Sequence, residues 1–139
     1  MSLQDQHSAM VRKLVKPGQV IKEQMTPEKA HLWHMATGVA GEAGELIDGI
    51  KKWVAYNKPL DRENIIEELG DLEFYMEGVR QGCNISRADT LEHNMKKLGV
   101  RYEGHNYTDE QAHQRKDKKV GHPVAEAIIE KKPTVEFQD

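Results

Sequence analysis

Two pairs of acidic residues are the part of this sequence best suited to chemistry. Glu42 and Glu45 lie three residues apart, and Glu68 and Asp71 have the same spacing. Residues three apart are neighbours on one face of a helix, so each pair could share one site. Projection at about 100° per residue, from 3.6 residues per turn, puts Glu68 inside the apolar sector of its helix. Asp71 flanks that sector, Glu42 flanks the apolar stripe of its own helix, and Glu45 lies further toward solvent.

Carboxylates beside a core are costly unless a cation or hydrogen-bond donors compensate for their charge. A divalent cation would do so, and all-oxygen ligation suits Mg²⁺ or Mn²⁺, which also bind substrate phosphates. A single pair is more often a solvated helix face, but two pairs beside apolar stripes on consecutive helices favour a metal site. A di-iron bundle fits less well because it uses Glu-x-x-His, and no histidine follows these glutamates at that offset. Glycines that would allow close approach line the first of the two helices: Gly38, Gly41 and Gly44.

The first pair lies on a long predicted helix. Thr26-Pro27-Glu28 is a good helix start, because threonine can cap, proline is tolerated at the first position and glutamate complements the dipole. We expect the helix to run from Pro27 to about Tyr56. Its core-facing stripe has steps of three and four residues. The stripe comprises Leu32, Met35, Val39, Ala43, Leu46, Ile50 and Trp53.

The second pair lies on the next helix. Asn57-Lys58-Pro59 breaks the first helix, Asp61 is placed to cap the second, and Gly82 is its expected stop. The apolar stripe of this second helix comprises Ile65, Leu69, Leu72, Met76 and Val79. Two long helices joined by a short connection pack as antiparallel neighbours in a bundle.

Shorter helices are expected on either side of this pair. Residues 4–14 predict a helix that the turn at Lys16-Pro17-Gly18 ends, followed by a connector or brief helix to about Met25. Ser86 and Asp89 form a variant capping box that opens a third helix. The apolar residues of this helix are Leu91, Met95, Leu98 and Val100.

The C-terminal part has a different character. Residues 108–118 are polar nearly all round and predict weak helix at best, whereas residues 119–139 regain apolar content and are expected to fold only against the bundle or a partner subunit. The predicted fold class is all-α: a helical bundle of two long antiparallel helices plus shorter helices, in an oligomer.

Composition limits the classes of function. A chain of 139 residues fits one domain, and 37% hydrophobic against 31% charged residues suits a core shared between subunits. The formal net charge is -3 with basic residues spread along the chain, so no nucleic acid polymer is expected as a partner. The single cysteine, Cys83, rules out an internal disulfide and fits a reducing cytoplasm. No run of eighteen apolar residues and no signal-like start is present, so we expect no membrane association.

The two acidic blocks resemble those of a known family, the all-α nucleoside triphosphate pyrophosphohydrolases of the MazG type, closest to its short, phage-encoded members. Gly38–Leu46 is similar to the family's Glu-x-x-Glu block, and Glu67–Leu72 to its Glu-x-x-Asp block. Further positions are similar in type and order: Lys16-Pro17-Gly18, His34, Lys51-Lys52-Trp53, Asn94, Lys97, Arg101 and Tyr102. The resemblance spans about residues 10–118. It implies a domain over 1–118, with its core at 26–102 and a C-terminal tail at 119–139.

The resemblance implies cleavage of a nucleoside triphosphate, often a deoxynucleotide, between the α and β phosphates to a monophosphate and pyrophosphate, with water as nucleophile and Mg²⁺ or Mn²⁺ as cofactor. It also implies a homodimer or homotetramer. The metal ligands would be Glu42, Glu45, Glu68 and Asp71. The general base would be Glu45 or Glu67, and the residues do not decide between them.

The same resemblance names residues that would bind substrate. The basic residues Lys97 and Arg101, with Asn94, share one face of the third helix and could contact a polyphosphate, although such a face is also a common solvated one. Trp53 and Tyr75 could stack on a base or pack in the core. The motif match adds three further candidates: His34, Lys52 and Tyr102.

Two alternatives to this function stay open. One is the related phosphoribosyl-ATP pyrophosphohydrolase of histidine biosynthesis, which uses similar carboxylates without needing the aromatic base stackers. The other is a helical module that senses a nucleotide or metal without turning it over. Product analysis separates the enzymes, and an assay for pyrophosphate release separates both from the sensing module.

Overall fold

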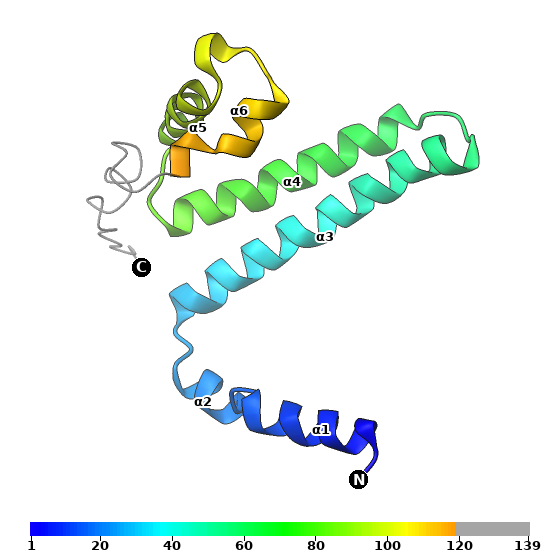
Figure 1. Ribbon diagram of the computed structural model, residues 1–139, viewed down its shortest axis with the longest axis vertical. Coiled ribbons are helices and arrows are strands. Elements are labelled where there is room, and N and C mark those ends of the chain that lie inside the picture. Colours follow the sequence, from blue (N-terminus) through cyan, green and yellow to red (C-terminus); the bar gives the residue numbers. More distant parts are fainter. Residues whose placement is uncertain (119–139) are drawn as a thin grey trace. The chain divides into compact units, whose positions relative to one another are not determined.

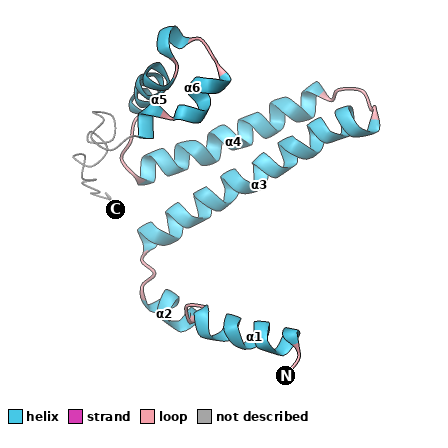
Figure 2. Cartoon of the chain, in the orientation of Figure 1, coloured by secondary structure: helices cyan, strands magenta, loops and turns pink. Residues whose placement is uncertain are grey.

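The computed structural model describes residues 1–118, which form helices and no strand (Figures 1 and 2). The predicted all-α class is therefore confirmed for this part of the chain. The predicted packing of the tail lies outside the described residues. The elements are α1 (Leu3–Leu14), α2 (Gly18–Glu23), α3 (Pro27–Tyr56), α4 (Arg62–Gly82), α5 (Arg87–Arg101), the 3₁₀ helix η1 (Glu103–His105), α6 (Asp109–Gln114) and the 3₁₀ helix η2 (Lys116–Lys118).

The chain divides into two compact units, Met1–His31 and a second that begins at Leu32. In the first unit, Ser2 and Asp5 form a capping box at the start of α1. The helix predicted over residues 4–14 is confirmed, and the segment before Met25 contains the brief helix α2. None of the helices within residues 1–118 combines the length and the apolar character needed to cross a bilayer.

The bounds predicted for α3 are confirmed, and local signals explain both ends. Thr26 Oγ1 accepts the backbone N–H of Lys29 at 3.3 Å, which caps the first turn. The helix ends at Tyr56 because Asn57 adopts a left-handed conformation, with φ at 51°. Asparagine tolerates that conformation better than most residues with a side chain.

The start of α4 is also as predicted, since Asp61 Oδ1 accepts the backbone N–H of Asn64 at 3.0 Å. Gly82 is the last helical residue, but it is not the left-handed residue of the cap. That residue is Asn84, with φ at 53°, and Ile85 N–H donates to the carbonyl of Arg80 at 2.9 Å. The helix therefore ends in a Schellman-type cap centred on asparagine.

Small residues allow α3 and α4 to approach closely (Figure 1). A Cβ added to Gly38 would overlap the ring of Tyr75, and one added to Gly78 would overlap Met35. Residues early in α3 thus contact residues late in α4. This register brings the middle of each helix, where the acidic pairs lie, to the same level.

The apolar stripes predicted for α3 and α4 are only partly buried within a single chain. Met35 is the one buried hydrophobic residue among residues 1–118, at 9% exposed. Ile50, Trp53 and Leu69 were expected in the core, yet they are 37%, 48% and 48% exposed, so that expectation is wrong for the isolated chain. A second set of large apolar residues that the stripes omit is even more exposed: Trp33, Ile47, Val54, Ile66 and Phe74.

The third predicted helix is α5, and its capping box is confirmed, with Ser86 and Asp89 each accepting the other's backbone N–H. α5 contacts η1, α6 and η2. Weak helix was expected over residues 108–118, but α6 forms there because Thr108 Oγ1 accepts the N–H of Gln111 at 3.2 Å. A threonine cap of this kind stabilises a helix whose polar residues offer little apolar surface for packing.

Candidate active site

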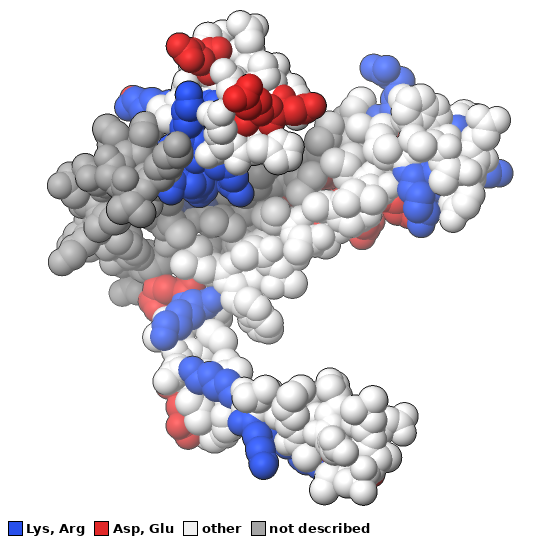
Figure 3. Space-filling model, in the orientation of Figure 1, with Lys and Arg blue, Asp and Glu red and all other residues white. Residues whose placement is uncertain are grey.

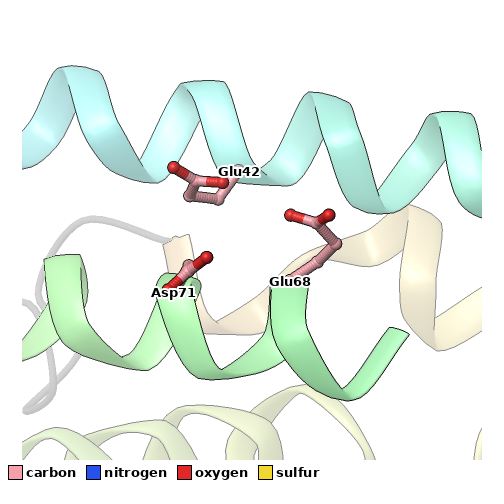
Figure 4. Close-up of side chains that lie close together, drawn as sticks. All are labelled: Glu42, Glu68 and Asp71. Atoms are coloured by element: carbon pink, nitrogen blue, oxygen red, sulfur yellow. The ribbon is translucent and has the colours of Figure 1, made fainter. Parts of the chain in front are cut away.

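Three carboxylates from α3 and α4 converge in the second unit. Glu42 comes from α3, Glu68 and Asp71 come from α4, and one oxygen from each lies within 4.8 Å of the other two (Figure 4). Figure 4 shows the Glu42 side chain directed at α4 and the other two directed back toward α3. The close pairing of the helices therefore gathers three of the four predicted metal ligands into one group.

The three carboxylates differ in exposure. Glu68 is buried at 5% exposed, as its place in the apolar sector predicts, and Glu42 is half-buried. Asp71 is exposed, so the expectation that it is shielded beside the core is wrong for the single chain. The buried Glu68 accepts a hydrogen bond from Asn64 Nδ2 at 2.8 Å. That bond partly compensates for the removal of Glu68 from water.

Within residues 1–118, no Lys or Arg forms an ion pair with Glu42, Glu68 or Asp71. Removal from water, together with the charges of Glu45, Asp71 and Glu68, raises the pKa of Glu42. Repulsion of this kind makes Glu42 more readily protonated and favours a cation at the same place. Three carboxylate oxygens are the donors that hard divalent cations prefer.

A hollow of about 390 Å³ adjoins the buried side of this group. Its lining comprises Gly41, Gly44, Glu45, Asp48, Lys52, Asn64 and Glu68. Glu45 is exposed and belongs to this hollow instead of the close group of three. Glu68 belongs to both and connects them.

Asp48, which lines the hollow, forms ion pairs with two lysines of α3. Its carboxylate contacts Lys52 Nζ at 2.9 Å and Lys51 Nζ at 3.0 Å. The hydrogen bonds from Lys52 and then Lys51 lower the pKa of Asp48, and the bond with Asp48 raises the pKa of Lys52. Lys52 therefore stays an ammonium at the edge of the hollow.

Asp48 and Asn64 are site residues that the sequence analysis did not find. The helical spacing that gave the acidic pairs would have found them: Asp48 follows Glu45 by three residues, and Asn64 precedes Glu68 by four. Glu67, the other candidate base, is exposed and belongs neither to the group of three nor to the lining of the hollow. Adjacent helical residues point about 100° apart, which separates Glu67 from Glu68.

The predicted aromatic stackers are far apart in one chain. Tyr75 lies against Gly38, and Trp53 lies about 22 Å further along α3 at 1.5 Å per residue. Tyr75 is half-buried and also contacts the ring of His34 edge-on, with the ring centroids 6.2 Å apart. One base could not stack on both aromatic residues of the same chain.

The predicted phosphate-binding residues of α5 are not equally available. Arg101 forms two hydrogen bonds to the fully buried carboxylate of Asp117, at 2.7 and 2.6 Å, so its guanidinium fastens η2 to α5. Asn94 is exposed and Lys97 is half-buried. The ring of Tyr102 packs at 5.5 Å from that of Tyr107.

On the face drawn in Figure 3, the described Lys and Arg residues lie in separate groups over several elements. This agrees with the spread of basic residues along the sequence.

The comparisons with known proteins place the chain in a family. Residues 32–104, more than half of the chain, match the model of the MazG nucleotide pyrophosphohydrolase domain. The protein belongs to this family of hydrolases, as the acidic blocks indicated. The matched residues include the group of three carboxylates and the whole lining of the hollow. Neither the comparison with curated proteins nor that with solved structures gives a match.

Proposed function

We propose that this protein hydrolyses nucleoside triphosphates, with deoxynucleotides as the main substrates, between the α and β phosphates to give a monophosphate and pyrophosphate. The observation that carries the proposal is the convergence of Glu42, Glu68 and Asp71 from two helices, within a chain of the MazG family. The products follow from attack of water at the α-phosphorus, with pyrophosphate as the leaving group.

The donor set fits Mg²⁺, with Mn²⁺ as a substitute, because it consists of carboxylate oxygens with uncompensated charge. Glu42, Glu68 and Asp71 would hold the metal, and Glu45 would complete the set from the hollow. Such a metal supplies charge compensation to the phosphates and acidifies bound water.

Residues of the chain itself have distinct roles in the proposed reaction. Glu45 lines the hollow and Glu67 does not, so Glu45 is the better candidate base, as an alternative to its role as a ligand. Lys52, held as a cation by Asp48, can contact a phosphate oxygen at the edge of the same hollow. Lys97 and Asn94 remain candidate phosphate contacts on α5.

A second copy of the chain is part of the proposal. A domain of this size normally encloses a substantial core, whereas the described residues of one chain bury only Met35 among the hydrophobic ones. Trp33, Ile47 and Val54 follow one another along α3 at multiples of seven residues and are 69%, 66% and 68% exposed. A homodimer or homotetramer of bundles would cover this face.

The test is pyrophosphate release from a panel of deoxynucleoside and ribonucleoside triphosphates, with phosphoribosyl-ATP included, in the presence of Mg²⁺ or EDTA. We expect Mg²⁺-dependent release of pyrophosphate from nucleoside triphosphates. Glu68→Gln should lower kcat by about a hundredfold or more, because it removes charge from the group of three. Glu45→Gln should also lower kcat, and the exposed Glu63 provides the matched control as Glu63→Gln.

Two results would contradict the proposal. Absence of pyrophosphate from every triphosphate, with a folded protein, would favour the sensing module. Exclusive turnover of phosphoribosyl-ATP would favour the histidine-pathway alternative.

A further inference from the structure

Asn64 occupies an unusual place beside the candidate metal site. Its Nδ2 donates to one oxygen of Glu68 at 2.8 Å, and Glu42 and Asp71 each place a carboxylate oxygen within 4.8 Å of an oxygen of Glu68. A buried carboxylate among like charges tends to turn away from them. A donor on one oxygen opposes that rotation, because it fixes the rotamer of the side chain.

Two contacts hold Asn64 in position. Its backbone N–H donates to Asp61 Oδ1 at 3.0 Å, which fixes the first turn of α4. On α3, a Cβ added to Gly49 would lie 2.8 Å from Asn64 Oδ1, so a side chain at this position would displace the amide. The amide is thus confined between the backbone of α3 and the carboxylate of Glu68. Rotating it by half a turn would set its oxygen against a carboxylate oxygen, which leaves the donating orientation as the favourable one.

We infer that Asn64, seated against Gly49, is a positioning residue that keeps the Glu68 carboxylate in the orientation in which it would bind a divalent cation together with Glu42 and Asp71. The inference rests on the proposed metal-dependent function. It assigns a role to two residues outside the acidic blocks, Asn64 and Gly49.

The experiment measures Mn²⁺ binding to the full chain without nucleotide, by titration calorimetry or by the electron paramagnetic resonance of free Mn²⁺. Asn64→Leu removes the donor at nearly constant volume, and Gly49→Ala displaces the amide while improving helix propensity. We expect each to weaken Mn²⁺ binding by about tenfold or more. Gly49→Ala should do so without lowering the thermal midpoint of the metal-free protein.

Gln81→Met is the matched control, because Gln81 Nε2 donates to Glu77 at 3.3 Å with the same four-residue spacing on the same helix, away from the acidic group. It should bind Mn²⁺ like the wild type. The double variant Asn64→Leu/Gly49→Ala should bind no more weakly than the poorer single variant, because both changes act through one hydrogen bond.

The outcomes separate this inference from the proposed function. Wild-type protein that binds no Mn²⁺ would overturn the metal site itself. Wild-type binding with unchanged affinity in both single variants would overturn the role of Asn64 while leaving the metal site intact. Additive losses in the double variant would show that Gly49 does not act through Asn64.

Discussion

Substitution by alanine should have opposite effects on the stability of the fold at two glycines of α3 that are three residues apart. At Gly38 an added Cβ would overlap the ring of Tyr75, whereas at Gly41 it would meet nothing within 4 Å. Both changes gain helix propensity of about 1 kcal/mol. At Gly38 the added methyl also costs about 1–3 kcal/mol of overpacking, since an aromatic ring cannot yield as a flexible chain can. We therefore expect Gly41→Ala to stabilise the fold and Gly38→Ala to destabilise it, by up to about 2 kcal/mol.

Thermal unfolding followed by circular dichroism measures the difference. At about 4 °C per kcal/mol for a domain of this size, the two variants should differ by several degrees. Protein concentration must be equal, because self-association shifts the midpoint, and EDTA removes any stabilisation by metal. Gly78→Ala should fall between the two, since the atom that it meets is the flexible end of Met35. Equal stabilisation by alanine at both α3 positions would refute the reasoning, because Tyr75 would then not lie over Gly38 and the register that gathers the carboxylates would be different.

Two further predictions concern the fold and its assembly. Arg101 lowers the pKa of the buried Asp117, with a smaller effect from Arg115, so this carboxylate stabilises the fold above its unfolded pKa of about 3.9 and loses that effect as pH falls through its lower folded pKa. Asp117→Asn should therefore lower the thermal midpoint at pH 7, and the gap to wild type should close below about pH 4; a gap independent of pH would contradict the role of the charge. Ile47→Glu should shift the protein to monomer or to unfolded chain in analytical ultracentrifugation, because Ile47 is 66% exposed in one chain and we place it under a second copy. The control Gln81→Glu should not change the mass, and an unchanged assembly in Ile47→Glu would exclude that face from the interface.

The features that could be predicted from the sequence are those that local signals and hydrophobic periodicity determine. The bounds of α3 follow from Thr26 and Asn57, and the burial of Glu68 follows from its angle to the apolar stripe. The exposure of Asp71 and Trp53 did not follow, because a stripe shows which face is apolar and not which chain covers it.

Contacts between residues far apart in the chain also could not be predicted from the sequence. Arg101 and Asp117 are sixteen residues apart in polar surroundings, and no helical spacing connects them. The same is true of Gly49 and Asn64, which meet only because two helices pack in one register. Periodicity locates a residue on its own element, whereas the partner of that residue depends on packing.

The glycines of α3 fall into two groups, one that helix packing requires and one that it does not. Each costs about 1 kcal/mol of helix stability relative to alanine, so their presence in one helix needs a reason at each position. Gly38 and Gly49 have that reason inside the chain, since Tyr75 and Asn64 occupy the space of a Cβ. Gly41 and Gly44 have no such neighbour, yet both line the hollow beside Glu68. Fold stability of one chain alone would favour alanine at these two positions, whereas under the proposed function the absence of side chains there would let a ligand approach the backbone of α3 next to the carboxylates.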